Sequence, residues 1–300
     1  MTQKILVIGS SNTDMMVKSR KMPAPGETVT GGTLHMGPGG KGANQAVAAR
    51  RLGGDVTFVC KVGRDIFGDN ALAGYRKEGV DISHAMRSDQ PSGVALILVD
   101  ESGENSISVA PGANADISVE DIRALADVIR SADYLLLQLE TPVESVMEAA
   151  RIAHEAGVYV ILNPAPACPL PEEVFGYISL LTPNRSEISL LSGVKVTDDE
   201  SLRVAAAKLR ARGVGDLVVT LGSRGSLVFC GPEETLIPAR KVEAVDTTAA
   251  GDTFCGGLCV GLSEGLGLVD AARFATAASA LTVQKMGAQD SIPYRNQIIL

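Results

Sequence analysis

Residues 134–164 read YLLLQLETPVESVMEAARIAHEAGVYVILNP. Two short apolar runs, YLLLQL and VYVIL, enclose a segment whose apolar residues recur at helical spacing. A strand, a crossover helix and a second strand of this kind form a unit in which the two strands run parallel. This stretch therefore predicts a parallel sheet with a helix packed on it.

The same alternation of short strands and longer helical segments recurs along the chain. It predicts an α/β fold in which helices sandwich a mostly parallel sheet. Ligands of such sheets bind at the carboxyl ends of the strands, so we expect the site near Glu140, Asn163, Asn184 and Gly222. The further strand-like runs are 4–9, 56–63, 178–183 and 216–222, and the further helical segments are 42–53, 67–80 and 201–213.

Two stretches break this alternation. Residues 13–39 and 92–111 are strand-like and rich in Gly, Pro and Thr. Within the second stretch, GVALILVD and ENSISVAPG predict two strands joined by a turn at Gly103. We expect both stretches to form a small β-sheet lid over the open edge of the main sheet, and residues 1–300 to form a single domain.

The composition is that of an ordinary globular protein, with 300 residues of which 45% are hydrophobic and 21% charged. A net charge of −8 argues against nucleic-acid and anionic-membrane partners, which select basic surfaces. No apolar stretch approaches the roughly 20 residues of a membrane helix. Five cysteines without CxxC spacing and three histidines predict a reduced, cytoplasmic protein without zinc. The opening residues MTQKILVIGS predict a first strand rather than a signal peptide.

The segment DTTAAGDTF, residues 246–254, places two carboxylates around a run of small residues, where an apolar helical pattern begins. One interpretation is an ordinary helix start, in which Asp246 or Thr247 caps the first turn. On that interpretation the segment needs no ligand.

The other interpretation is an anion site. Small side chains leave the backbone N–H groups of Ala249, Ala250 and Gly251 open to a phosphoryl group at a helix N-terminus. Asp252 then lies beside the anion and could take a proton from a hydroxyl that attacks it. The segment alone does not decide between the two interpretations.

The segment GPGGKG, residues 37–42, matches a dinucleotide-binding pattern, but that pattern should follow the first strand, which ends at Gly9. It is not a P-loop either, because Lys41 is followed by Gly42 rather than by Ser or Thr. We interpret the segment as a flexible turn that carries Lys41 and Asn44 into a helix. The alternative is a tight turn without a ligand.

The segment SSNTD after the first strand supplies Asn12 and Asp14. Together with Lys41, Asn44 and Glu140, these residues offer amide, ammonium and carboxylate groups. A neutral polyol requires such a mixture, because each hydroxyl both donates and accepts hydrogen bonds. Taken alone, Asn12 and Asp14 also fit a turn at the end of a strand.

Two further segments suit a nucleotide. TLGSRG, residues 220–225, joins two predicted strands, and its two glycines would let the backbone approach phosphates. A plain hairpin turn fits this segment equally well. TPNRSE, residues 182–187, places Asn184 before a helix with Glu187 three residues later, which also fits a capping box.

GGKGANQAVAA at residues 39–49 and DTTAAGDTF at residues 246–254 resemble the two signatures of the ribokinase-like (PfkB) carbohydrate kinases. The segments PGETV, QLETPVESV, LNPAPA, TPNRSE and TLGSRG extend the similarity over nearly the whole chain. The resemblance implies a Rossmann-like α/β domain with a β lid that clasps the lid of a second subunit, and therefore a homodimer.

The resemblance implies ATP-dependent phosphorylation of D-ribose to D-ribose 5-phosphate with Mg²⁺. Asp252 would be the base, and Ala249, Ala250 and Gly251 would form an anion hole for the transferred group. The sugar contacts that it implies are Asn12, Thr13, Asp14, Gly40, Lys41, Gly42, Ala43, Asn44, Glu140 and Asp252. The nucleotide contacts that it implies are Asn184, Thr220, Leu221, Gly222, Ser223, Arg224, Gly225, Gly251, Asp252 and Thr276.

The resemblance also implies a monovalent cation, usually K⁺, beside the anion hole. The positions that match the cation site, several of them through backbone oxygens, are Asp246, Thr248, Thr282, Lys285, Gly287 and Ser291.

The chain departs from some relatives near the adenine, where Thr276 stands in place of their His.

Other activities stay open at this point. The substrate could be another small sugar, such as deoxyribose or fructose, or a nucleoside. A nucleoside kinase should have apolar or aromatic lid residues for the base, and only 4% of the chain is aromatic. A binding-only or regulatory relative would lack the base, whereas Asp252 is present.

Overall fold

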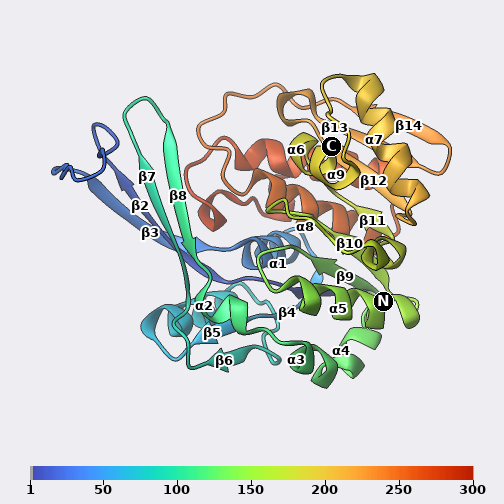
Figure 1. Ribbon diagram of the computed structural model, residues 1–300, viewed down its shortest axis with the longest axis horizontal. Helices are drawn as coiled ribbons and strands as arrows, with labels where there is room; N and C mark the ends of the chain where they lie inside the picture. Colours follow the sequence, from blue (N-terminus) through green and yellow to red (C-terminus); the bar gives the residue numbers. More distant parts are fainter. Residues whose placement is uncertain (1–2, 300) are drawn as a thin grey trace.

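The computed structural model describes residues 3–299. In that part of the chain the main sheet has the strand order β14-β13-β12-β11-β10-β9-β1-β4 (Figure 1). All neighbours from β4 to β12 pair in parallel, and β13 and β14 add an antiparallel edge. The strands are β1 Lys4–Ile8, β4 Asp55–Val59, β9 Tyr134–Leu137, β10 Tyr159–Leu162, β11 Leu180–Leu181, β12 Asp216–Thr220, β13 Ser226–Cys230 and β14 Glu233–Ile237.

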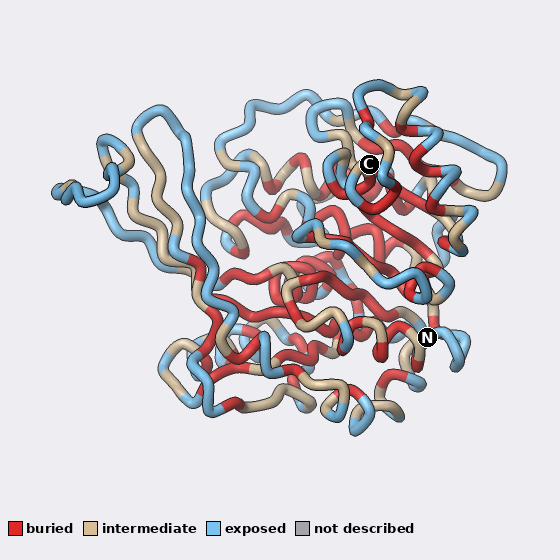
Figure 2. Tube along the Cα trace, in the orientation of Figure 1, coloured by how far each residue is buried: buried red, intermediate tan, exposed pale blue. Residues whose placement is uncertain are grey.

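Helices cover both faces of this sheet, which confirms the predicted α/β class. Successive side chains of a strand point to opposite faces. Ile5 and Val7 therefore belong to the core shared with α1, α2, α8 and α9, whereas Leu6 and Ile8 belong to the core shared with α3 to α7. Figure 2 shows the buried centre that results. The helices are α1 Lys41–Arg51, α2 Ile66–Lys77, α3 Val119–Ala124, α4 Ala126–Arg130, α5 Val143–Glu155, α6 Arg185–Ser192, α7 Asp199–Ala211, α8 Ala250–Ser263 and α9 Leu268–Thr282.

A second sheet of four strands, in the order β3-β2-β7-β8, projects from the body of the molecule (Figure 1). It is the predicted lid, and its β7–β8 hairpin turns at Gly103, whose φ of 87° suits glycine. The strands are β2 Asn12–Lys18, β3 Thr33–Gly39, β7 Gly93–Val99 and β8 Asn105–Ala110.

The structure differs from the sequence expectation at residues 56–63, which do not form one strand. The chain leaves the main sheet after Val59, and Lys61–Gly63 forms β5, which pairs with β6 Met86–Ser88 in a separate two-stranded sheet. The backbone N–H of Met86 donates to the carbonyl of Cys60, so the β6 segment binds the chain just where it leaves the main sheet. None of the described helices is long and apolar enough to cross a membrane.

Helix α8 packs unusually close to α1, because glycine faces α1 at the contact. A Cβ added at Gly256 would lie 2.8 Å from both the Cβ of Ala48 and the carbonyl oxygen of Gln45. On the adjoining side of α8, a Cβ at Gly257 would lie 3.2 Å from the Cα of Ala275 in α9. The three helices therefore approach at backbone distance, which brings the N-termini of α1 and α8 together.

We expect Gly256→Val to destabilise the protein by about 1–3 kcal/mol, because a bulky side chain must push α8 away from α1. The midpoint of urea unfolding, at an unchanged slope, measures the loss. Gly74→Ala in α2 is the control, since a Cβ there meets nothing within 4 Å and Ala favours the helix. A Gly256→Val protein as stable as the wild type would show that the helices do not need this glycine.

Candidate functional site

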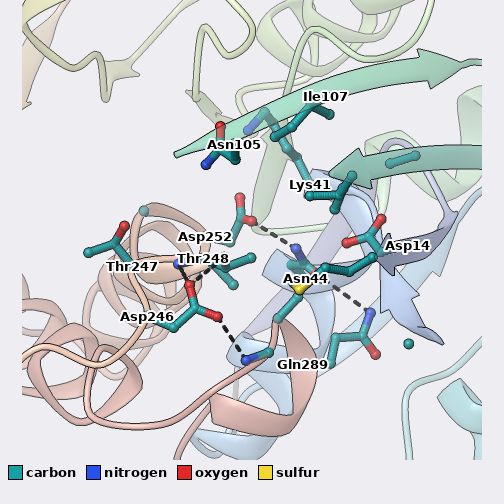
Figure 3. Close-up of a pocket in the computed structure, with 18 of the residues that line it drawn as sticks. Asp14, Lys41, Asn44, Asn105, Ile107, Asp246, Thr247, Thr248, Asp252 and Gln289 are labelled. Atoms are coloured by element: carbon teal, nitrogen blue, oxygen red, sulfur yellow. Dashed lines mark hydrogen bonds between the residues drawn. The ribbon is translucent and has the colours of Figure 1, made fainter. Parts of the chain in front are cut away.

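A cleft of about 970 Å³ lies between the lid and the carboxyl ends of the main-sheet strands. The lid contributes residues such as Asp14, Asn105 and Ile107, which face Lys41 and Asp252 from the body of the molecule (Figure 3). The positions that strand ends predicted also line the cleft, namely Glu140, Asn163 and Asn184.

A second cavity of about 600 Å³ lies beside the cleft, between the loop 239–244 and helices α8 and α9. The two cavities share lining residues, among them Asn184 and Gly251. They therefore meet at the N-terminus of α8, which is where a group could pass from a ligand in one cavity to a ligand in the other.

The N-terminus of α1 is built by a glycine turn. Gly40 has a φ of 89°, and a Cβ there would lie 2.8 Å from the backbone N of Asn12. Glu140 then closes the helix from outside: its Oε2 accepts hydrogen bonds from the backbone N–H of Lys41, at 2.9 Å, and from Ser10 Oγ, at 2.6 Å. This contact fixes Glu140 and the start of α1 relative to each other.

Asp14 on β2 is a half-buried carboxyl group at the wall of the cleft. The pKa of Asp14 is raised from 3.8 to about 6, and burial is the largest cause. The negative charges of Glu140 and Asp252 contribute to this rise, whereas the positive charge of Lys41 opposes it. Asp14 therefore gains or loses a proton within the physiological pH range.

Asp252 lies in the first turn of α8, buried, and each of its oxygens accepts one hydrogen bond. Asn44 Nδ2 donates to Oδ2 at 2.9 Å, and Gln45 Nε2 donates to Oδ1 at 3.0 Å. Burial raises the pKa of Asp252, and the charge of Lys41 and both amide donors oppose that rise. The network therefore favours an ionised carboxylate in a site largely shielded from water.

Lys41 supplies the positive charge of the cleft. Burial lowers its pKa, but the carboxylates of Asp252 and Glu140 outweigh burial and raise the pKa above its usual value. Lys41 is therefore held as an ammonium group. Because charges attract more strongly where water is excluded, this ammonium group stabilises negative charge at the cleft floor.

The start of α8 corrects one of the two interpretations of residues 246–254. Neither Asp246 nor Thr247 caps the helix: α8 begins at Ala250, and its N-cap is Ala249, which has a φ of 58° and makes no side-chain cap bond. A left-handed conformation is costly for a residue with a Cβ and is found mainly at functional sites. The Asp246 carboxylate is bonded to Thr248 and Gly287 instead.

The backbone N–H groups of residues 249–251 differ in whether they have hydrogen-bond partners. Ala250 N donates to the carbonyl of Thr247 at 3.2 Å, so this N–H of the predicted anion hole already has a partner. Within residues 3–299, the N–H groups of Ala249 and Gly251 donate to no protein acceptor. A Cβ at Gly251 would meet nothing within 4 Å, which leaves open space in front of the turn.

Asp246 acts as a tie between two segments of the chain. Its Oδ1 accepts from the backbone N and the hydroxyl of Thr248, at 2.9 and 2.6 Å. Its Oδ2 accepts from the backbone N of Gly287 at 2.9 Å, as Figure 3 shows. The loop before α8 is thereby fastened to the segment that follows α9.

Only some of the residues matched to a cation site line the cleft, namely Asp246, Thr248 and Gly287. Two of the others have hydroxyl groups engaged elsewhere: the Thr282 hydroxyl donates to Thr253 Oγ1 at 3.0 Å, and Ser291 Oγ donates to the Ala288 carbonyl at 2.7 Å. The carbonyl of Thr282 accepts from the backbone N of Lys285. Across the described residues, no three His, Cys, Asp or Glu side chains cluster as metal ligands.

Three of the residues that were expected to contact a sugar do not line the cleft. Side chains alternate along β2, so Asn12 and Asp14 face the cleft while Thr13 faces away. Gly42 and Ala43 are buried under the glycine turn, where a Cβ at Gly42 would lie 2.5 Å from the backbone N of Ser10.

Among the residues that were expected to contact a nucleotide, Asn184 caps α6 in a capping box with Glu187, as one interpretation predicted, and it also lines both cavities. Two positions of the 220–225 loop lie outside the second cavity: Leu221 is partly buried and packs against the core, and Arg224 pairs with Asp199 at 2.8 Å. The expected nucleotide contacts that do line the second cavity are Asn184, Thr220, Gly222, Ser223, Gly225, Gly251 and Thr276.

Sequence reasoning missed two buried amides that hold the site. Gln45 donates to Asp252, and Gln289 Nε2 donates to Asn44 Oδ1 at 3.2 Å. A signal existed for Gln45, because a Gln stands among Ala and Val in a helix that must be buried. For Gln289, which lies in the segment after α9, the sequence offers no comparable sign.

The comparisons with known proteins agree with this geometry. The family model "pfkB family carbohydrate kinase" matches residues 2–295. A ribokinase of Haemophilus influenzae is 42% identical over 300 residues, which cover 100% of this chain and 98% of that protein. A deoxyribokinase of Salmonella typhi is 36% identical over 293 residues, covering 96% of this chain and 95% of that protein.

Among solved structures, Arabidopsis thaliana ribokinase in complex with ribose and ATP superposes with a TM-score of 0.92. It is 34% identical, and the match covers 99% of this chain and 98% of that chain. The motifs, the lid and the cleft are therefore found in one recognised group of enzymes. The chain belongs to the pfkB family of carbohydrate kinases.

Proposed function

We propose that this enzyme transfers the γ-phosphoryl group of ATP to O5 of D-ribose, giving D-ribose 5-phosphate and ADP. One observation carries the proposal: the buried carboxylate of Asp252 lies at the N-terminus of α8, where the two cavities meet. The similarity to ribokinases over the full chain supports ribose as the substrate.

In the proposed reaction, Asp252 takes the proton of the ribose O5 hydroxyl as O5 forms a bond to the γ-phosphorus. The bond from that phosphorus to the bridging oxygen breaks, and ADP leaves. Phosphoryl transfer asks mainly for alignment and for stabilisation of charge on the transferred group. The free N–H groups of Ala249 and Gly251 and the ammonium group of Lys41 would supply that stabilisation.

The sugar would lie in the cleft under the lid. Asp14 and Glu140 are acceptors there, Lys41 is a donor, and the amides of Asn12 and Asn44 offer both. This combination suits a neutral polyol better than an anionic metabolite, which would want more cationic groups. We assign the sugar site to these five residues, with Gly40 shaping its edge.

ATP would occupy the second cavity, with its γ-phosphate at Gly251. The walls are largely apolar, from residues such as Phe254, Ala280 and Val283, and such walls suit a flat purine ring. The turn at Gly222 and Ser223 lies at the same cavity and offers backbone and hydroxyl groups to phosphate.

Mg²⁺ would enter with ATP. This ion usually binds one or two protein carboxylates together with substrate phosphates and water, and the described residues contain no complete protein site for it. Glu187 fits the role of the single carboxylate, because it lines the cleft beside the shared residue Asn184. Bound Mg²⁺ would neutralise charge on the phosphates.

K⁺ would bind where the loop before α8 meets the segment after α9. Backbone carbonyl oxygens are the ligands that K⁺ prefers, and these two segments are fastened by Asp246 and by the bonds from Val245 N and Asp246 N to the carbonyl of Val283. We assign the ion to oxygens of Asp246, Thr248, Thr282, Lys285, Gly287 and Ser291.

A homodimer through the lid is also proposed. The lid carries exposed apolar side chains that do not line the cleft: Leu34 is 59% exposed and Leu96 55%. Exposed apolar surface of this kind is typical of a subunit interface. We further propose that residues 1–300 act as one kinase domain in the cytoplasm, where the five free cysteines would stay reduced.

A second candidate substrate is deoxyribose, since a deoxyribokinase is 36% identical to this chain. An assay that couples ADP release to ribose, deoxyribose, fructose and adenosine distinguishes the candidates. The proposal expects the highest kcat/KM with ribose. A preference for any other of these substrates would overturn the assignment of ribose.

Asp252→Asn should fold but lose roughly 100- to 10,000-fold in kcat, because it removes the general base and leaves the N–H groups in place. Calorimetry of ribose binding to the variant checks that the sugar site survives. A kcat near that of the wild type would remove Asp252 from the chemistry.

Ribose affinity should fall as pH drops below 6. A sugar hydroxyl donates to the ionised form of Asp14, and protonation of the unliganded protein near pH 6 competes with that contact. Linkage then predicts a loss of about tenfold in affinity between pH 7 and pH 5. Titration calorimetry measures it; Asp14→Asn should bind weakly with no such dependence, and an unchanged wild-type affinity at pH 5 would contradict the prediction.

K⁺ should activate turnover by ordering the loop that aims the free N–H groups. Loss of one such donor costs about 100- to 1000-fold in rate. Turnover is compared in K⁺, Na⁺ and a bulky organic cation at fixed ionic strength, for the wild type and for Asp246→Ala. We expect activation by K⁺ that the variant lacks. A wild type indifferent to the three cations would end the cation proposal.

Leu96→Lys should split the dimer, because the charge would be buried between two lids. Light scattering at micromolar concentration should give the mass of two chains for the wild type and of one chain for the variant. Val204→Lys on α7 is the control, since Val204 is equally exposed but lies away from the lid. A wild type with the mass of one chain would contradict the dimer.

A further inference from the structure

Gln45 is a fully buried polar side chain in α1 that does not line the cleft in the described part of the chain. Its Nε2 is 3.0 Å from Asp252 Oδ1 and 3.0 Å from Asn163 Oδ1, so its two N–H protons have two acceptors. Its Oε1 accepts from Gln138 Nε2 at 2.7 Å. All the hydrogen-bonding groups of this amide are therefore engaged.

The neighbours fix which way the Gln45 amide faces. Asn163 Nδ2 donates to the carbonyl of Thr182 at 2.9 Å, so Asn163 presents its oxygen to Gln45. Gln138 presents an N–H to the other end of the same amide. A flipped Gln45 would place oxygen against oxygen and N–H against N–H, so its donor end must face Asp252.

The donor end of Gln45 meets the oxygen of Asp252 that Asn44 does not hold. Asn44 lines the cleft, so the sugar can compete for its amide. Gln45 has no such access to a ligand. A ligand in the cleft therefore cannot compete for the bond from Gln45 to Asp252, as it can for the bond from Asn44.

We propose that Gln45 is a positioning residue for the phosphoryl transfer: its fixed amide keeps Asp252 aimed at the sugar hydroxyl and keeps it ionised. The proposal rests on the proposed function, in which Asp252 is the base. It adds a residue that touches neither the sugar nor the nucleotide.

The charges around Asp252 show why a neutral donor is suited to this place. Burial is the main influence that disfavours the ionised carboxylate; Lys41 on α1 favours it, and Glu140 after β9 disfavours it. Asp14 on the lid, Glu187 on α6 and Cys255 on α8 also face this group. A second cation would pair with these acids or with phosphate, but an amide stabilises Asp252 without attracting them.

The test replaces Gln45 by Met, which has a similar size and no N–H. A hydrogen bond donated to a charged group changes the pKa of that group by about one to two. We expect the acid limb of the kcat–pH profile to move to higher pH by that amount. We also expect kcat at pH 7 to fall and KM for ribose to change less than about threefold. An unmoved limb, or a loss confined to KM, would overturn the proposal.

Ser145→Ala controls for the loss of a buried hydrogen bond. Ser145 Oγ donates to the carbonyl of Ile117 at 2.7 Å, on the face of the sheet opposite α1. This variant should lose stability and keep the wild-type pH profile. A matching shift in Ser145→Ala would mean that loosening of the fold, and not Gln45, moves the profile, which would also overturn the proposal.

A direct titration separates this inference from the proposed function. In protein labelled with ¹³C at the aspartate carboxyl groups, the Asp252 signal is identified by its loss in Asp252→Asn. Its midpoint should rise in Gln45→Met and rise further in Gln45→Glu, where two carboxyl groups share the space. Equal midpoints in wild type and variants would overturn the role of Gln45, even if Asp252→Asn shows that Asp252 is the base.

Discussion

The close contact between α1 and α8 is the constraint on which the site depends. Gly256 lets α8 approach α1 at backbone distance, so that Asp252 at the start of α8 reaches Asn44 and Gln45 at the start of α1. The two helices come from opposite ends of the chain, and each contributes a signature of the family. Their packing therefore brings the turn that we propose to bind the sugar next to the turn that would hold the phosphoryl group.

Several features of the site reduce the stability of the folded protein, and the surrounding fold must offset this loss. Ala249 is held in a left-handed conformation, and the carboxyl groups of Asp14 and Asp252 lie buried near Glu140. Groups of this kind reduce stability in the unliganded protein, and enzymes commonly retain them where activity requires it. The two apolar cores on the faces of the sheet and the tie at Asp246 provide the compensating stability.

The sheet, its flanking helices and the lid could be predicted from the sequence, because each shows in the local spacing of apolar residues along the chain. The sequence also placed Glu140, Asn163 and Asn184 near the cleft, since parallel strands bring their carboxyl ends to one edge. The helix start at residues 246–254 was ambiguous, because a capped turn and an anion turn use the same small and acidic residues. The left-handed backbone conformation of Ala249 decides between the two interpretations, and it cannot be predicted from the residue types of the segment.

Other features depend on contacts between distant residues and could not be read locally. The strand run 56–63 leaves the main sheet because β6 binds the chain at Cys60, a partner 26 residues away in sequence at Met86. Arg224 matches a nucleotide contact by position, yet Asp199 on another helix draws it away. Gln45 and Gln289 act through hydrogen bonds to residues that only the fold brings near them.

The most direct test of the account is a crystal structure with ribose and a non-hydrolysable ATP analogue. The account predicts that O5 of ribose lies within about 2.6–3.2 Å of an oxygen of Asp252, with the γ-phosphate at the N–H groups of Ala249 and Gly251 and the second Asp252 oxygen still bound to Gln45. A sugar hydroxyl that approaches the γ-phosphate while Asp252 lies out of its reach would contradict the account.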